Sequence, residues 1–181
     1  RREYVDPLAM SAILGFTGKV SASEMAARPS LSYEDTAGKA GLEAYYDQLL
    51  RGYKGKKIIE IDSRGVQTRF RLTQNPESGN SLHITADREL QSFAYETLQA
   101  FTRGSHAASV VILDARNGAL RSLVSFPGFD TNKFGLSMSK EEFDTLLNDR
   151  LKPLFNRAIA GEYPSGSTIK PNSTAYGNTV S

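Results

Sequence analysis

The 181-residue chain is predicted to have an α+β fold, in which a small mixed domain precedes part of a second domain with an antiparallel sheet. Three observations predict this. Two stretches have the pattern of β-hairpins, and one long stretch repeats its apolar residues at helical spacing. A nine-residue run of turn formers, Thr73–Ser81, separates two patterned halves. We therefore place a boundary near Pro76, with a first domain over residues 1–76 and a second over residues 77–181.

The first domain is predicted to contain short helices and one hairpin. Ser21 and Ser23 are possible caps of a polar helix. A second helix is expected over Leu42–Leu50, where Gly52 would end it. The hairpin is expected over Lys56–Leu72, where isoleucines alternate with polar residues before a turn.

The second domain is predicted to open with a short strand at Ser81–Thr85, followed by a helix that Asp87 caps and that runs to Arg103. One apolar stripe of this helix is expected to face the core, formed by Leu90, Ala94, Leu98 and Phe101.

A hairpin and a further helix are expected next. The hairpin covers Ala108–Ser125 and turns at Asn117-Gly118, and we expect Asp114 and Arg116 to shape it. Its run Val110–Leu113 is apolar on both faces, which predicts a central strand. Ser139–Glu142 has the pattern of a capping box and opens a helix that ends near Asn148.

Composition excludes several functions. The net charge is +2, from 22 basic and 20 acidic residues, so the bulk charge does not favour nucleic acid as a partner. The chain has no cysteine, which excludes disulfides, Cys-ligated metal and a Cys nucleophile. His83 and His106 lack the spacing of a ligand pair, so we expect structural or surface roles for them and predict neither a metal nor a cofactor.

No targeting or membrane-spanning segment is recognised in the sequence. No stretch approaches the ~18 apolar residues that a spanning helix needs. The N-terminal basic pair is not followed by the apolar core of a signal peptide. The chain is therefore expected to be a piece of a longer protein.

Three interpretations compete for the stretch Tyr163–Pro171, "YPSGSTIKP". The spacing of Gly161 and Gly166 suits a phosphate loop, but Ser167 stands where that loop requires a lysine. A chance Ser-x-x-Lys match in a loop is the second interpretation. The third is a serine nucleophile with a lysine base, since a helix beginning at Ser167 would place Lys170 on the same face. That lysine must be neutral to accept a proton, which requires a lowered pKa.

The context of this stretch resembles a known family. Three segments are similar, in the same order, to the transpeptidase domain of class B penicillin-binding proteins: "HITADRELQSFAYETL", "ASVVILDARNGALRSLVSFPGFDTNKF" and "NDRLKPLFNRAIAGEYPSGSTIKP". The segments "ILGFTGKVSASEM" and "GKAGLEAYYDQLLRGYKGKKIIEIDSRGV" resemble the membrane-proximal pedestal domain of the same family. The Gly38–Glu43 segment before a Tyr-Tyr pair favours the elongation type, while the division type stays open.

The resemblance implies a function. Ser167 would be the nucleophile that accepts the acyl group, and Lys170 its general base. The substrate would be the D-Ala-D-Ala end of a peptidoglycan stem peptide, and β-lactams would trap the same serine. The pedestal would receive an elongation scaffold protein and the glycan polymerase. The parent protein would lie in the bacterial inner membrane with periplasmic domains, through an anchor absent from this chain.

The sequence also departs from the family pattern. The motifs Ser-x-Asn and Lys-Thr/Ser-Gly, expected after the nucleophile, do not follow Lys170. Ser78–Asn80 spells the first motif on the wrong side of Ser167, so we interpret it as a turn. We therefore expect that this chain alone does not crosslink. Asn156 and Arg157 are expected to pack the segment before Ser167 and not to touch substrate.

An alternative function is a non-catalytic interaction module formed by residues 1–76. Its exposed apolar material would dock scaffold proteins. The residues concerned are Ile13, Leu14, Phe16, Tyr45 and Tyr46. We expect most of these side chains to belong to the core of the small domain instead.

Overall fold

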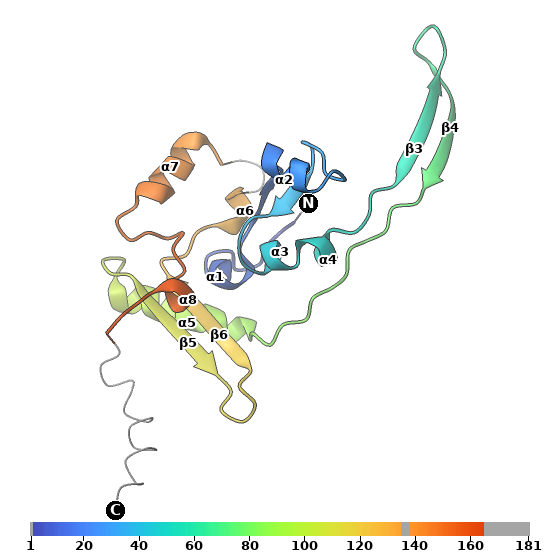
Figure 1. The fold of residues 1–181 in the computed structure, drawn as a ribbon. Helices are drawn as coiled ribbons and strands as arrows, with labels where there is room; N and C mark the ends of the chain where they lie inside the picture. The colour runs from blue at the N-terminus through green and yellow to red at the C-terminus, as the bar shows by residue number, and fades with distance from the viewer. Residues whose placement is uncertain (1, 135–137, 165–181) are drawn as a thin grey trace, which may run out of the picture.

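The computed structural model describes residues 2–134 and 138–164 (Figure 1). Its helices are α1 (Ser11–Leu14), α2 (Ala22–Ala27), α3 (Gly41–Tyr45), α4 (Asp47–Arg51), α5 (Arg88–Thr102), α6 (Thr131–Phe134), α7 (Lys140–Asn148) and α8 (Arg157–Ala160). Its strands are β1 (Thr17–Lys19), β2 (Thr36–Gly38), β3 (Lys56–Ile61), β4 (Gln67–Gln74), β5 (Ala108–Leu113) and β6 (Leu120–Phe126). The mixture of helices and small antiparallel sheets confirms the α+β class.

Three two-stranded antiparallel sheets form, from β1 with β2, β3 with β4, and β5 with β6. Both predicted hairpins are confirmed. In the second hairpin, Asp114 accepts from the backbone N–H of Arg116 at 3.1 Å and from its guanidinium at 2.9 and 3.0 Å. Gly118 takes a φ of 72°, the left-handed conformation that this turn requires and glycine adopts at little cost.

The helix caps follow the sequence signals. Ser21 and Ser139 each form a capping box with the glutamate three residues later, and the Asp87 side chain accepts from the N–H of Leu90 at 3.1 Å. The helix expected over Leu42–Leu50 is instead divided into α3 and α4, with Tyr46 between them. In residues 2–134 and 138–164, no helix combines the length and apolarity needed to span a bilayer.

Two strand predictions are wrong. Ser81–Thr85 forms no strand; the Thr85 hydroxyl instead donates to the carbonyl of Leu120 at 2.8 Å, a single side-chain contact. In the described part of the chain β5 pairs only with β6 and is not central. Its apolar run is covered on one face, and Val111 on the other face remains 48% exposed.

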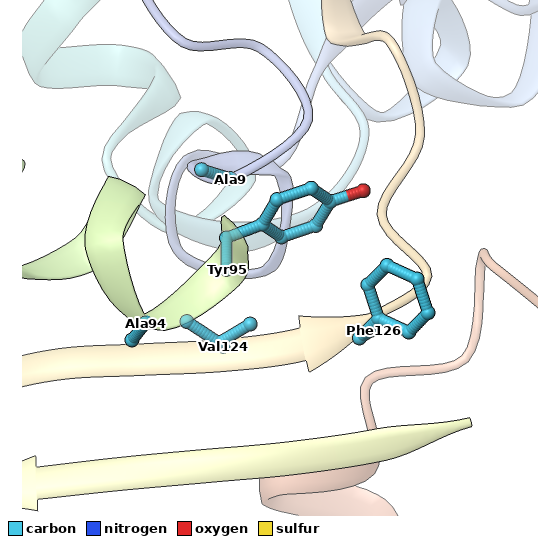
Figure 2. Close-up of a cluster of buried hydrophobic side chains, with 5 residues drawn as sticks. All are labelled: Ala9, Ala94, Tyr95, Val124 and Phe126. Carbon is cyan, nitrogen blue, oxygen red and sulfur yellow. The ribbon is translucent and has the colours of Figure 1, made fainter. Parts of the chain in front are cut away.

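The core lies where α5 crosses β6 (Figure 2). It consists of Ala9, Ala94, Tyr95, Val124 and Phe126, with Leu98 and Val110 packed against it. Ala9 belongs to the N-terminal segment, so residues from both halves of the sequence share one core. The division at Pro76 stays a prediction.

The buried face of α5 differs from the predicted stripe. Ala94 is buried and Leu98 is half-buried, but Phe101 is 86% exposed. The fully buried residue on this helix is Gln91, which the apolar pattern could not indicate. The face that packs is therefore rotated from the stripe that hydrophobicity alone marks.

Gln91 uses its whole side-chain amide. Its Nε2 donates to the carbonyls of Ala9 at 2.7 Å and Leu123 at 2.8 Å. Its Oε1 accepts from the Ser122 hydroxyl and the Leu123 N–H, both at 2.8 Å. The amide thus satisfies the backbone of β6 at Leu123 as a neighbouring strand would, while it also holds the N-terminal segment.

Two further amide side chains join the N-terminal segment to the second half. Asn132 donates to the carbonyl of Tyr4 and accepts from its N–H, both at 2.9 Å. Asn156 donates to the carbonyl of Ala12 at 2.9 Å. Residues 4–12 are therefore held by side-chain contacts far along the chain.

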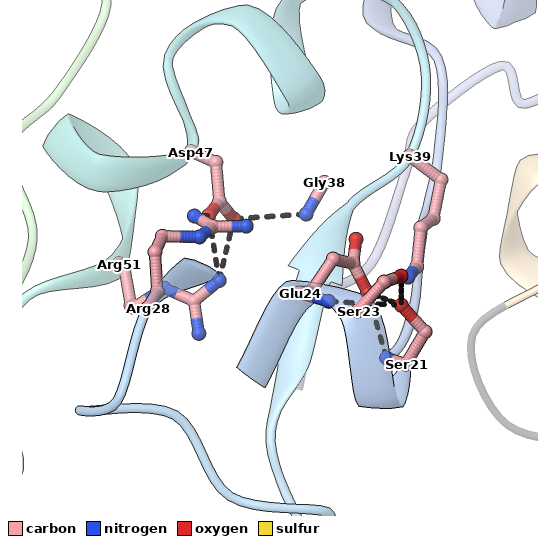
Figure 3. A network of polar contacts seen from close by, with 8 residues as sticks. All are labelled: Ser21, Ser23, Glu24, Arg28, Gly38, Lys39, Asp47 and Arg51. Carbon is pink, nitrogen blue, oxygen red and sulfur yellow. Dashed lines mark hydrogen bonds and ion pairs between the residues drawn. The ribbon is translucent and has the colours of Figure 1, made fainter. Parts of the chain in front are cut away.

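A charged network joins the elements of the first half (Figure 3). Asp47 accepts from the N–H of Gly38 at 2.8 Å and from the guanidinium groups of Arg28 and Arg51 at 2.6 Å. Burial alone would raise the pKa of Asp47, but these donors outweigh it and lower the pKa. The Lys39 ammonium, 2.5 Å away, is the largest of the contacts that lower the pKa of Glu24 to about 2.

We expect Gln91→Leu to lower the free energy of unfolding by about 3 kcal/mol or more, because it leaves buried backbone groups of Ala9 and Leu123 without partners. Gln99→Leu, on the exposed side of the same helix, is the control and should change stability by less than about 0.5 kcal/mol. Urea unfolding followed by circular dichroism measures both. Equal effects of the two variants would show that the Gln91 bonds contribute nothing specific.

We expect the chain to lose stability as the pH falls from about 4.5 towards 2. Glu24 and Asp47 have lowered pKa values in the folded state, so their contribution is present above the unfolded values near 4 and is lost as they are protonated. Asp47→Asn should flatten this dependence, whereas Asp144→Asn on an exposed face of α7 should not. The free energy of unfolding measured at several pH values tests this; parallel curves for all three proteins would contradict it.

Candidate active site

The predicted nucleophile Ser167 and base Lys170 lie outside the described residues. The structure describes the chain up to Pro164, three positions before Ser167. The site can therefore be built from the elements that lead to it, which are β6 and α8 with the loop between α7 and α8.

Ser125 of β6 attaches this loop to the sheet. Its hydroxyl donates to the carbonyl of Phe155 at 3.1 Å and accepts from the N–H of Arg157 at 3.0 Å. The N–H at the start of a helix has no partner within the helix, so the hydroxyl satisfies a group that would otherwise be buried and unpaired. One small side chain thereby fixes where α8 begins.

Arg157 holds the loop from the other side. Its side chain is buried, and its guanidinium donates to the carbonyls of Lys152 at 3.0 Å and Phe155 at 3.2 Å, and to that of Leu151. These are backbone acceptors of the preceding turn, which suits the fixed fork of an arginine. The expectation that Arg157 packs the segment before Ser167 is confirmed.

Close packing continues beyond α8. A Cβ atom on Gly161 would lie 2.6 Å from the carbonyl oxygen of Arg157 and 2.3 Å from the ring of Tyr163. Only glycine therefore fits between the last turn of α8 and the Tyr163 ring. The contacts fix the course of the chain towards the predicted nucleophile.

An apolar cavity of about 620 Å³ adjoins α8. Its walls include Leu123 and Ser125 of β6 and Ile159 of α8, and α1 and α3 close the other side with Ile13 and Tyr45. Among the described residues that line it there is no carboxylate, lysine, arginine or histidine; the polar side chains in its wall include Ser11, Ser125 and Tyr45.

The histidines and metal ligands give no further site. Among residues 2–134 and 138–164, no group of three or more His, Cys, Asp or Glu side chains could hold a metal ion. His106 lies with its Nδ1 2.7 Å from the Ser105 hydroxyl, and His83 is exposed.

The apolar residues considered for an interaction surface differ in burial. Phe16 packs in an aromatic group with Phe129 and Phe134, at centroid distances of 5.8 and 4.1 Å. Ile13, Leu14 and Tyr46 are half-buried, whereas Tyr45 is 81% exposed. Four of the five side chains are therefore partly buried, and Tyr45 is the exposed one, but Phe16 packs against residues of the second half and not within a core of residues 1–76 alone.

Sequence reasoning missed two positioning residues, Gln91 and Ser125. Both are polar and lie in segments expected to be apolar or exposed. A polar residue at a position that a helix or strand must bury is the one signal that could have found them, because such a residue requires partners.

Two family models match the chain in order. Residues 1–84 match the penicillin-binding protein dimerisation domain, and residues 108–179 match the penicillin-binding protein transpeptidase domain. The chain belongs to the penicillin-binding proteins. This confirms the family resemblance of the sequence.

Relatives and solved structures agree with the family. The chain is 34% identical over 180 residues to "Peptidoglycan D,D-transpeptidase MrdA" of Haemophilus influenzae, which covers 94% of this chain and 26% of the relative. Identity to the MrdA of Escherichia coli K12 is 35% over 177 residues, or 94% of this chain and 27% of the relative. The complex of penicillin-binding protein PBP2 with MreC from Helicobacter pylori matches at 26% identity with a TM-score of 0.75, over 98% of this chain and 33% of that chain. The chain thus spans about a quarter of the length of these curated relatives.

We expect Ser125→Ala to lower the free energy of unfolding by about 2 kcal/mol, because the carbonyl of Phe155 and the N–H of Arg157 lose their shared partner. Ser109 lies directly opposite on β5 and is exposed, so Ser109→Ala is a matched control that should be nearly neutral. Amide hydrogen exchange of Arg157 gives a second measurement, because only Ser125→Ala should accelerate it. Unchanged exchange at Arg157 would contradict the assigned role of Ser125.

Proposed function

We propose that the parent protein is an elongation-type peptidoglycan D,D-transpeptidase that crosslinks stem peptides through a serine acyl-enzyme. One observation carries this proposal: 94% of this chain aligns with relatives named as D,D-transpeptidases. The match to the transpeptidase domain, over residues 108–179, spans the Ser-x-x-Lys motif. The elongation type is favoured over the division type because the relatives at 34–35% identity are MrdA proteins.

Ser167 and Lys170 have the central roles in the proposed reaction. The neutral amine of Lys170 accepts the hydroxyl proton as Ser167 Oγ attacks the carbonyl carbon of the penultimate D-Ala. The peptide bond breaks, the terminal D-Ala leaves with a proton on its amine, and an ester joins the stem peptide to Ser167. An amine of a neighbouring stem then attacks that ester, forms the crosslink and releases the serine.

A β-lactam follows the first half of this reaction. Ser167 opens the lactam ring and forms an ester, and the former leaving group stays attached to the acyl-enzyme. The attachment of α8 to β6 through Ser125 and Arg157 supports the proposal, because a nucleophile must be held within about 0.5 Å of its productive position and the chain leading to it is fixed at several points.

The location and partners of the parent protein follow from the same proposal. Its domains act in the periplasm, and a segment not in this chain anchors it in the inner membrane. Its substrate is the D-Ala-D-Ala end of the stem peptide. The first half of this chain serves as the pedestal that receives an elongation scaffold protein and the glycan polymerase.

A specific observation favours the second candidate function, a non-catalytic docking module. The solved complex of a related PBP2 with MreC matches 98% of this chain, which leaves at most a few residues of the first half outside the match. Tyr45, 81% exposed on α3, presents an aromatic side chain of this half to a partner.

We expect the full-length parent to be labelled by a fluorescent penicillin at one equivalent, and Ser167→Ala to abolish the label. Lys170→Ala should slow labelling by at least about a hundredfold, because the hydroxyl loses its base. Ser165→Ala is the control and should keep most of the label. In-gel fluorescence with a time course measures the rates, and labelling that survives in Ser167→Ala would exclude Ser167 as the nucleophile.

The same fluorescent penicillin, applied to the 181-residue chain, tests whether this piece alone can be acylated. The result is independent of the role of Ser167 in the parent protein. We expect no labelling, because the Ser-x-Asn and Lys-Thr/Ser-Gly motifs do not follow Lys170 in it. Stoichiometric labelling that Ser167→Ala abolishes would show that these motifs are not needed for acylation.

A further inference from the structure

Asn156 stands at the start of α8, the last described helix before the Ser-x-x-Lys motif. Its backbone carbonyl accepts from the N–H groups of Ile159 at 3.3 Å and Ala160 at 2.9 Å, so this residue is part of the first turn. The helix has only four residues, and a helix that short is not stable by itself in water. The position of α8 therefore depends on the groups that attach its first residues to the rest of the molecule.

The side chain of Asn156 does not cap its own helix. An asparagine directly before a helix normally accepts a hydrogen bond from the second or third N–H group of that helix. Asn156 makes no such bond. Its Nδ2 instead donates to the carbonyl of Ala12 in α1 at 2.9 Å, a contact between residues 144 positions apart. The stabilisation that a cap would give to α8 is thus replaced by an attachment to a distant helix.

The carbonyl of Ala12 fixes the orientation of the Asn156 amide. A carbonyl oxygen accepts hydrogen bonds and cannot donate them, so the Nδ2 group must face it and the Oδ1 atom must point away. The Oδ1 atom is buried, and no group among the described residues donates to it. A side chain of the same shape without the N–H groups would be repelled by the carbonyl of Ala12.

The helix α1, which accepts this bond, is packed tightly against α3 of the first half. A Cβ atom on Gly15, which ends α1, would lie 2.0 Å from the carbonyl oxygen of Ala40, the residue before α3. A Cβ atom on Gly41 would lie 2.7 Å from the carbonyl oxygen of Ile13. The two helices therefore meet backbone against backbone, and α1 cannot shift without moving α3.

Among the described residues, the other side-chain hydrogen bonds that hold the start of α8 come from the second half. They are made by Ser125 of β6 and by the Arg157 guanidinium, and α8 also packs against β5 and β6. By contrast, α1 and α8 face one another across the apolar cavity, which both helices line. Asn156 bridges these two helices and so attaches α8 to the first half.

We propose that Asn156 is a positioning residue for Ser167, which it supports by holding the start of α8 on α1. This inference rests on the proposed function, because it concerns the serine of that reaction. The chain from α8 to Pro164 is closely packed at Gly161, so a shift of α8 is passed along it. A displacement of a reacting group by about 1 Å can slow a reaction ~100-fold, even when the mutation is far from the chemistry. Asn156 need not touch substrate to act in this way.

Asn156→Asp in the full-length parent tests the proposal, because a carboxylate has the shape of the amide but only accepts hydrogen bonds. We expect the fluorescent penicillin to acylate this variant about tenfold more slowly at saturating probe, because the serine is displaced. The dissociation constant of the probe before acylation should stay within about twofold, because the groups that bind it are unchanged. Time courses at several probe concentrations give both constants.

Asn132→Asp is the matched control. Asn132 also binds the N-terminal segment, at the N–H and the carbonyl of Tyr4, but it belongs to α6 and not to α8. Its substitution should destabilise the protein, yet leave the acylation rate constant within about twofold. Asn156→Ala removes the donor without adding charge and should slow acylation about threefold or more. This second variant decides the result if Asn156→Asp does not fold.

Acylation rate constants that stay within about twofold of the wild-type value in the Asn156 variants overturn the inference, as does an equal slowing in Asn132→Asp. A smaller labelled fraction with an unchanged rate constant also overturns it, because a merely structural role lowers only the amount of folded protein. A wild-type parent that takes no label, or that keeps its label in Ser167→Ala, contradicts the proposed function itself and the inference with it.

Discussion

The side-chain amide of Gln91 is the contact on which the rest of this fold depends. An amide is chemically one peptide unit, and here it completes the hydrogen bonds of β6 at Leu123 while it also binds the carbonyl of Ala9. Because Gln91 is fully buried, no water can replace those bonds, and the helix, the strand and the N-terminal segment must meet at one geometry. An apolar residue at position 91 would fill the same space, but it would not fix the positions of the helix, the strand and the N-terminal segment relative to one another.

The amide contacts explain how distant segments act as one body. Asn132 binds the backbone of Tyr4, and Asn156 binds that of Ala12. The N-terminal segment is therefore attached to the second half at two further, separate positions. Asn156 also precedes α8, the last described helix before the Ser-x-x-Lys motif. A few hydrogen bonds therefore connect the N-terminal segment to the chain that leads to the proposed nucleophile. A displacement of that segment would also displace this chain.

Local signals in the sequence predicted local structure well. Caps such as Ser139 and the hairpin turn at Gly118 were correct because a few neighbouring residues determine them. The predictions that Phe101 is buried and that Ser81–Thr85 forms a strand were wrong, because long-range packing decides both features. The site shows the same division. The Ser-x-x-Lys spacing is visible in the sequence, whereas the role of Ser125 depends on a loop thirty residues away.

The contacts that join the first half differ in chemistry from those that hold α8. The first half is joined by carboxylates, with Asp47 and Glu24 each bound to cations, so protons compete for its contacts in acid. The attachment of α8 to β6 and to the turn before it uses a hydroxyl, a guanidinium and backbone carbonyls, and no carboxylate. Acid therefore weakens the contacts of Asp47 and Glu24 in the first half, whereas the hydrogen bonds that hold α8 to β6 do not depend on a carboxylate.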